Sequence, residues 1–300
     1  MRNRIITASA ALTLIISGLA EAAPGDRLRA RMASNQSQPV PGRQTISYGA
    51  DPLQNLDFWR AAGNAKAPLV IYVHGGGWQR GSKDNATGRF KPVHYPEQGY
   101  AFASIDYRLV PGATVEQQAA DVVGALRALL DRAEQLGIDR SHVVLMGHSA
   151  GAHLVALVGT DERYLRAARL SFADLSGVIP IDGAAYDVPA QMRHGPRMMQ
   201  QTYAQAFGTD LARQRALSPT LQAAAPNAPA FLIPHVQRED GVRQSNALAA
   251  ALRASGTAAE TAGFPGTGLV GHMQINRSMG DPDYAATPVV DVWLKRVFER

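Results

Sequence analysis

Short apolar runs alternate with helical patterns over most of this 300-residue chain. The run at 68–74 (PLVIYVH) is continuously apolar, partly β-branched and followed by glycines, which is typical of a strand buried on both faces. Residues 114–137 instead place apolar side chains at helical spacing, with Thr114 and Gly137 as candidate caps. The same alternation predicts further strands at 100–107, 142–147, 175–183 and 229–236, and helices at 150–159, 245–255 and 288–298.

Strands that alternate with helices of this length predict an α/β protein, with a mostly parallel sheet covered on both faces. The segment 184–227 departs from the alternation because it is long and contains Met192, Met198, Met199 and Tyr203. Flexible apolar side chains in an insertion favour a lid or the wall of a substrate pocket. An ordinary packed pair of helices is the alternative.

The N-terminus has the pattern of a secretory signal peptide. Arg2 and Arg4 precede an apolar stretch that ends at Ala20, and small residues at Ala20 and Ala22 suit a signal peptidase. The apolar stretch is short for a membrane crossing. We therefore expect a signal peptide at 1–22, no stable membrane insertion after its cleavage, and a periplasmic or secreted protein. Residues 23–45 are rich in Ala, Arg, Ser, Gln and Pro and predict a flexible lead-in to a catalytic domain at 46–300.

Composition narrows the function classes further. The 30 basic and 25 acidic side chains give a net charge of +5, and the arginines are scattered rather than gathered with aromatic residues. This argues against nucleic-acid binding and indicates that the mildly basic face is solvated surface. The chain contains no cysteine, which excludes disulfides, a thiol nucleophile and thiolate metal ligands.

A candidate nucleophile lies in the stretch Gly147–Gly151 (GHSAG). This stretch matches G-x-S-x-G, in which the serine occupies a strained turn between a strand and a helix and flanking side chains would clash with neighbouring backbone. The predicted strand 142–147 and helix 150–159 supply that context. The sequence therefore predicts Ser149 as a nucleophile.

Three consecutive glycines follow the strand at 68–74, in the stretch HGGGW (74–78). A glycine loop at this place can turn its N–H groups toward a developing oxyanion without a Cβ atom in the way. We expect the donors to be Gly76 and Gly77, together with Ala150 directly after the serine.

These motifs, with DYRL (106–109), GHSAGAHL (147–154) and GH (271–272), resemble the carboxylesterases of hormone-sensitive-lipase and feruloyl-esterase-like type in the α/β-hydrolase superfamily. The resemblance covers about residue 46 to the C-terminus. It implies hydrolysis of a small-molecule ester by a serine, an acid and a histidine in that order along the chain, and it implies no cofactor.

Four histidines follow the serine: His153, His194, His235 and His272. The family order implies His272 as the base, because it follows a glycine-rich segment (264–271) before the last helix. His153 is then a packed core histidine, His235 is packed at a strand end, and His194 is at the surface.

The acid is expected in the loop after the strand at 229–236. There Asp240 fits the family spacing and Glu239 is the alternative. A third candidate is Asp182, since some lipases place the acid after the preceding strand.

Other residues near these motifs have two possible roles. Trp78 is expected at the mouth of the substrate pocket, with simple packing as the alternative. His148 is expected in the pocket. His148 and His153 are five residues apart, the wrong offset for a metal pair on one helix face. We expect His74 to brace the oxyanion loop, together with Asp106 and Arg108.

The sequence thus predicts an exported serine carboxylesterase. An arylformamidase-like amide hydrolase is the nearest alternative, because it shares the serine turn and a related glycine loop. A non-catalytic binding protein on the same scaffold is the alternative from another class.

Overall fold

The computed structural model describes residues 40–63, 66–84 and 90–299. The predicted signal peptide (1–22) and residues 23–39 of the predicted lead-in lie outside the described residues. The described remainder of that lead-in contains the start of strand β1 (Gln44–Ser47), which begins two residues before the predicted domain start at residue 46.

Eight strands form one sheet in the described part of the chain, in the order β1-β2-β4-β3-β5-β6-β7-β8. Strands β1 and β2 are antiparallel to their neighbours, whereas the pairs from β4 to β8 are parallel. The prediction of an α/β fold with a mostly parallel sheet is confirmed. The remaining strands are β2 (Asn55–Trp59), β3 (Ala67–Val73), β4 (Ala101–Ile105), β5 (Ile138–His148), β6 (Gly177–Ile181), β7 (Ala230–Gln237) and β8 (Ala258–Thr267).

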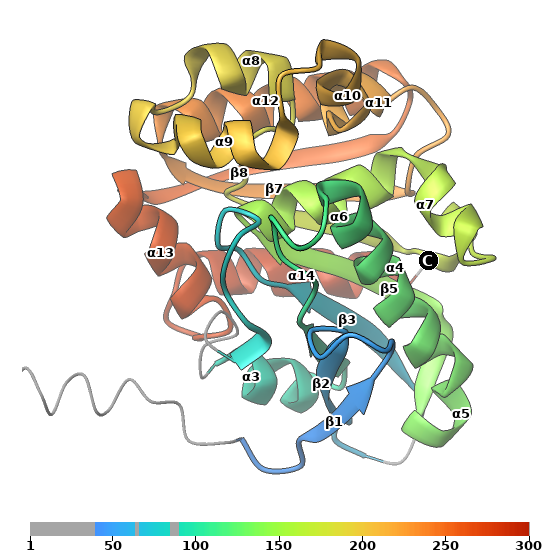
Figure 1. Cartoon of the computed structure of the whole chain (residues 1–300). Coiled ribbons are helices and arrows are strands. Elements are labelled where there is room, and N and C mark those ends of the chain that lie inside the picture. Colours follow the sequence, from blue (N-terminus) through green and yellow to red (C-terminus); the bar gives the residue numbers. More distant parts are fainter. Residues whose placement is uncertain (1–39, 64–65, 85–89, 300) are drawn as a thin grey trace, which may run out of the picture. The chain divides into compact units, whose positions relative to one another are not determined.

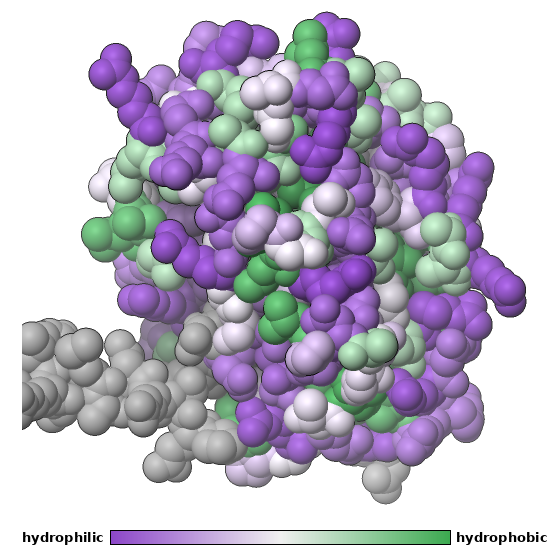
Figure 2. All heavy atoms as spheres, in the orientation of Figure 1, coloured by the Kyte–Doolittle hydropathy of each residue, from purple (hydrophilic) through white to green (hydrophobic). Residues whose placement is uncertain are grey.

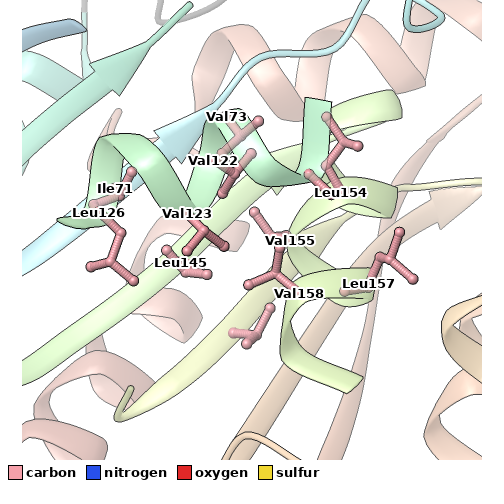
Figure 3. Close-up of a cluster of buried hydrophobic side chains, with 14 of the residues drawn as sticks. Ile71, Val73, Val122, Val123, Leu126, Leu145, Leu154, Val155, Leu157 and Val158 are labelled. Atoms are coloured by element: carbon pink, nitrogen blue, oxygen red, sulfur yellow. The ribbon is translucent and has the colours of Figure 1, made fainter. Parts of the chain in front are cut away.

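Helices cover both faces of this sheet (Figure 1). Leu69, Ile71 and Val73 of β3 point to the face covered by α4 (Val115–Asp131), α6 (Ala150–Thr160) and α12 (Glu239–Ala254). In Figure 3, side chains of β3, β5, α4 and α6 meet in this cluster. Val70 and Tyr72 point to the opposite face, which is covered by α3 (Lys91–Glu97), α13 (Gly268–Ser278) and α14 (Ala286–Phe298). Burial on both faces explains why β3 is continuously apolar.

The predicted helix at 114–137 is two helices, α4 and the short α5 (Ala133–Leu136). Thr114 caps α4 in a capping box with Gln117, and Gly137 ends α5 with a φ of 70°. Both predicted caps are confirmed.

Two predicted boundaries near the candidate site are wrong. The helix expected at 245–255 begins at Glu239, so Asp240 lies in the first turn of α12 and not in a loop. The segment expected to be a glycine-rich loop, 264–271, is instead the end of β8 and the first turn of α13. His272 therefore projects from a helix.

The insertion at 184–227 folds into short helices that lie at the top of Figure 1: α8 (Val188–His194), α9 (Gln200–Phe207), α10 (Leu211–Ala216) and α11 (Pro219–Gln222). It is attached to the sheet domain by apolar packing, in which Phe207 and Leu217 join the main core, and by polar contacts. Arg213 of α10 forms a bidentate ion pair with Glu116 of α4, at 2.7 and 2.8 Å. The insertion also contains the 3-10 turn η2 (Arg197–Met199), whereas α7 (Glu162–Ala167) and the 3-10 turn η1 (Phe172–Asp174) precede it in the chain.

The face shown in Figure 2 is largely polar, and its apolar residues form small separate groups. Among the described residues, no helix combines the length and the apolar character needed to cross a membrane.

Candidate active site

Ser149 lies at the sharp turn where β5 ends and α6 begins. Its backbone has φ 57° and ψ −115°, a conformation that a residue with a side chain rarely adopts. A methyl group on Gly147 would lie 2.4 Å from the carbonyl oxygen of Gly151, and one on Gly151 would lie 2.1 Å from the carbonyl oxygen of Val73. Only glycine fits at these two positions, so the motif has the steric role that the sequence predicts.

His272 lies beside this serine although the two are far apart in sequence. Its Nε2 atom is 3.0 Å from the Ser149 hydroxyl oxygen. Its Nδ1 atom is 2.6 Å from a carboxylate oxygen of Asp182. With the proton on Nδ1 donated to Asp182, the Nε2 lone pair can accept the serine proton, which is the arrangement a general base needs.

Asp182 follows directly after β6, and its carboxylate lies at the Nδ1 edge of the His272 ring. Its side chain is fully buried, and its second carboxylate oxygen accepts a hydrogen bond of 3.2 Å from the backbone N–H of Val236. Burial alone raises the pKa of the Asp182 carboxyl. The hydrogen bond from His272 and the charge of Arg238 outweigh burial, so the pKa of Asp182 is lower than its ordinary value. Asp182 is therefore an anion held against the imidazole.

The prediction that Asp240 orients His272 is wrong. The Asp240 carboxylate accepts two hydrogen bonds from Arg238, at 2.6 and 2.7 Å, and one from Gln191 at 3.0 Å. The alternative Glu239 is also excluded from this role, because its side chain is 95% exposed and pairs with Arg243. The early start of α12 at Glu239 explains both positions.

The third sequence candidate, Asp182, is the acid that contacts the histidine. The sequence contains two signals that could have favoured Asp182 over Asp240. Asp182 directly follows an entirely apolar strand, where a buried carboxylate needs a partner, and Arg238 precedes Asp240 by two positions and can bind its carboxylate.

The loop after β3 brings the glycines of HGGGW against the serine turn. A methyl group on Gly75 would lie 2.9 Å from the Cβ atom of Ser149. Gly76 has φ 122°, and a methyl group there would lie 1.9 Å from the carbonyl oxygen of Arg80. Gly77 has φ 63°. These positions require glycine for its conformation and for the close approach of the loop to Ser149.

The N–H groups of this loop remain available for a ligand. In the described part of the chain, the structure shows no acceptor for the N–H of Gly76 or Gly77. The N–H of Ala150 belongs to the first turn of α6, where backbone donors have no partner within the helix. The three predicted oxyanion donors thus lie on the two segments that meet at Ser149.

Trp78 has a different place from the one expected at a pocket mouth. Its side chain is only 2% exposed and packs edge-on against Phe207, with ring centroids 4.8 Å apart. Its indole N–H donates to Nδ1 of His153, at 3.3 Å, and Nε2 of His153 donates to the carbonyl oxygen of Leu217, at 2.8 Å. Burial lowers the pKa of His153 to about 4, so this histidine is neutral in the core. Trp78 packs the glycine loop against the insertion.

His148, which the sequence predicts in the substrate pocket, is 3% exposed and lies beside His272. Its Nε2 atom donates to the carbonyl oxygen of His272 at 2.9 Å, and the two ring centroids are 4.4 Å apart. Burial and then the charge of His272 lower the pKa of His148 well below its ordinary value. A neutral His148 therefore fixes the backbone of the residue that carries the base.

The expected bracing of the glycine loop is present in part. The ring of His74 stacks on Tyr107 at 4.3 Å, and the Tyr107 hydroxyl donates to the carbonyl oxygen of His74 at 2.9 Å. Asp106 is 3.8 Å from His74 and accepts a hydrogen bond from the N–H of Lys83. Arg108 instead pairs with Asp121 of α4.

Backbone strain is concentrated at the residues just described. Among the described residues other than glycine, a positive φ occurs at Trp78, Ser149, Asp182, Arg169 and Ala185. Three of these belong to the glycine loop, the serine turn and the carboxylate beneath His272. Strained backbone of this kind collects at functional sites, because the surrounding packing must hold it.

A serine at a strand-to-helix turn of a mostly parallel sheet, with a buried carboxylate directly after a later strand and a histidine on the helix that follows the last strand, defines an α/β-hydrolase. Residues 56–252 match the model of the BD-FAE family, which is more than half of the chain. The chain belongs to the BD-FAE family. The matched range contains Ser149, Asp182 and Asp240 and ends before His272.

Two relatives share part of the sequence with this chain. Esterase LipC of Mycobacterium tuberculosis is 36% identical over 119 residues, which are 39% of this chain and 29% of that protein. Kynurenine formamidase of Drosophila melanogaster is 36% identical over 93 residues, which are 31% of this chain and 30% of that protein. The similarity therefore covers less than a third of the length of each relative.

The fold extends over a greater length than the sequence similarity. The crystal structure of esterase B from Lactobacillus rhamnosis matches with a TM-score of 0.70 and 23% identity, covering 92% of this chain and 91% of that one. At this identity the match shows a common fold.

Proposed function

We propose that this protein is a serine carboxylesterase, with Ser149 as the nucleophile, His272 as the general base and Asp182 as the orienting acid. The observation that carries the proposal is the pair of hydrogen bonds that links the three residues. One joins the Ser149 hydroxyl to Nε2 of His272, at 3.0 Å, and the other joins Nδ1 of His272 to Asp182, at 2.6 Å. Membership of the BD-FAE family and the partial similarity to Esterase LipC support the choice of esters.

In the first half of the reaction, the Ser149 oxygen attacks the carbonyl carbon of the ester while His272 takes the hydroxyl proton. Asp182 stabilises the imidazolium that forms, and its hydrogen bond keeps the proton-accepting nitrogen directed at the serine. The N–H groups of Gly76, Gly77 and Ala150 stabilise the negative oxygen of the tetrahedral intermediate. His272 then returns the proton to the leaving alcohol.

In the second half, water attacks the acyl-enzyme and His272 takes the proton of that water. The second tetrahedral intermediate uses the same three donors. Collapse of the intermediate releases the carboxylic acid and restores the Ser149 hydroxyl. The residues named here perform each step, so the mechanism uses no cofactor.

A panel of substrates tests the proposed reaction. Short-chain p-nitrophenyl esters and N-formylkynurenine would be compared at equal concentration, together with feruloyl and acetyl-sugar esters. The proposal predicts that kcat/KM is highest for an ester. A higher kcat/KM for N-formylkynurenine would instead support the arylformamidase alternative, and no turnover of any substrate would support a binding protein.

We also propose that the protein is exported, on the basis of the charged and apolar pattern of residues 1–22. N-terminal sequencing of the protein purified from the cells that make it should then give Ala23 as the first residue. A first residue of Met1 or Arg2 would contradict export by cleavage after Ala22.

A further inference from the structure

Arg238 lies at the end of β7, and its guanidinium group joins two carboxylates in the interior. Its Nη1 atom donates to both oxygens of Asp240, at 2.6 and 2.7 Å, and its Nε atom is 3.4 Å from the carboxylate of Asp182. Its Nη2 atom also donates to the carbonyl oxygens of Asp182 and Gly183, at 3.2 and 3.1 Å. Arg238 thus contacts both the side chain and the backbone of the residue beneath His272.

These contacts hold a strained segment. Asp182 has φ 42°, and its carbonyl oxygen has no strand partner beyond the end of β6. A planar guanidinium group with five donors can bind a carboxylate and two carbonyl oxygens together, which a lysine ammonium cannot do with the same geometry. The side chain of Arg238 is 16% exposed, so these bonds are largely shielded from water.

Asp240 connects this cluster to the insertion. Gln191 of α8 donates to Asp240 at 3.0 Å and to the hydroxyl of Tyr203 of α9 at 2.9 Å. Tyr203 in turn packs against Trp78 of the glycine loop, with ring centroids 6.1 Å apart. The side chain of Asp240 is 7% exposed, and its negative charge balances that of Arg238.

We propose that Arg238 and Asp240 are positioning residues for the catalytic triad: Arg238 holds Asp182 in place, and Asp240 limits how strongly the charge of Arg238 acts on Asp182 and His272. This inference rests on the triad proposed above. It assigns a role to Asp240, which the sequence analysis predicts as the triad acid but which does not contact His272.

The sign of the effect follows from the charges around His272. Among the described residues, the titratable and charged groups around His272 are His148 at the end of β5, Asp182 after β6, and the Arg238–Asp240 pair after β7, with the hydroxyl of Tyr284 near Asp182. A positive charge near the imidazole disfavours its protonated form, and a negative charge favours it. Removal of the Asp240 charge should therefore lower the titration midpoint of His272. Removal of both charges should raise it, because Arg238 contacts Asp182 and is the nearer of the two.

Two variants and a control separate these effects: Asp240→Asn, the double variant Arg238→Met with Asp240→Asn, and Glu239→Gln. The control removes a carboxylate from the adjacent position, where the side chain is 95% exposed. NMR titration of histidine ring protons in the full chain would give each midpoint, with the His272 signal assigned from a His272→Gln variant. This measurement needs no catalytic turnover.

We expect the midpoint to fall by about half a pH unit in Asp240→Asn, to rise by about half a unit in the double variant, and to stay within about 0.2 units in Glu239→Gln. Shifts of the two test variants in the same direction, or midpoints equal to that of the wild type in folded protein, would overturn the proposal. If Asp240→Asn does not fold, the double variant alone decides the sign.

A geometric readout complements the charge readout. Arg238→Lys keeps the charge and loses the bidentate bonds, so kcat on an ester should fall by about tenfold while the midpoint stays near that of the wild type. An unchanged kcat would remove the positioning role. Failure of the proposed function would give a different result. The wild-type protein would then not react with a fluorophosphonate, although the His272 midpoints of the variants would still shift as described.

Discussion

Replacement of Asp182 by asparagine is the most informative single change for the proposed triad. The asparagine keeps the size of the side chain and can still accept the hydrogen bond from the N–H of Val236. It removes the negative charge that lies 2.6 Å from Nδ1 of His272. An amide can also donate to Nδ1, which would turn the proton of the imidazole toward the serine and block proton transfer.

The loss of charge sets the magnitude. A carboxylate about 4 Å from the centre of positive charge on an imidazolium contributes about 4 kcal/mol at an effective dielectric constant of about 20. Three orders of magnitude in rate correspond to about 4 kcal/mol. The wrong tautomer adds to this loss, so we expect kcat to fall by about 10³ to 10⁴.

Steady-state kinetics on one p-nitrophenyl ester would measure this loss, with Asp240→Asn as the matched control. Asp240→Asn makes the same chemical change at a buried carboxylate that does not contact His272, and we expect it to lower kcat by less than about tenfold. Thermal unfolding curves would establish that both variants are folded. A loss in Asp240→Asn that equals or exceeds the loss in Asp182→Asn would refute the assignment of the acid.

Two further predictions concern the glycine loop and the buried histidines. Gly76→Ala should lower kcat by about 10² to 10³, because a methyl group 1.9 Å from the carbonyl oxygen of Arg80 must displace an oxyanion donor. The control Gly99→Ala, also at positive φ but in open space, should lower the stability and leave kcat unchanged. Equal kcat values for the two variants would contradict this role. Burial lowers the pKa of His74 and His153 to about 4, whereas both histidines have their ordinary pKa of 6.5 in the unfolded chain. Because the unfolded chain binds protons first, the free energy of unfolding should fall as the pH decreases from about 6.5 to about 4, by up to about 3 kcal/mol for each histidine. Urea midpoints that do not change between pH 7 and 5 would contradict it, and His153→Gln should reduce the slope.

The sequence predicts the parts of the site that depend on local structure. The turn around Ser149 and the glycine loop each need several residues at fixed spacing, because their neighbouring backbone leaves no room for a Cβ atom. The alternation of apolar runs and helical patterns likewise predicts the parallel sheet, since each run is buried on both faces. These signals can be read from residues that are adjacent in the chain.

The choice between Asp182 and Asp240 depends on contacts between distant segments. Spacing from β7 favours Asp240, but α12 begins at Glu239 and Arg238 binds the Asp240 carboxylate. Asp182 reaches His272 because β6 lies beside β7 and α13, which carries His272, packs against β7 and β8. The sequence signal for β8 and α13 is also weak, because β8 is mostly exposed or half-buried and carries no continuous apolar run. The positive φ angles of Asp182 and Trp78 are imposed by the folded backbone, so no local sequence pattern predicts them.

Covalent labelling can establish whether Ser149 is the nucleophile of an ester hydrolase. Intact protein would be treated with a fluorophosphonate, and the modified residue would be located by mass spectrometry. We expect one adduct per chain, on Ser149, with complete loss of esterase activity, and no adduct in Ser149→Ala. Wild-type protein that hydrolyses esters but carries no adduct, or that carries it on a residue other than Ser149, would show that Ser149 is not the nucleophile.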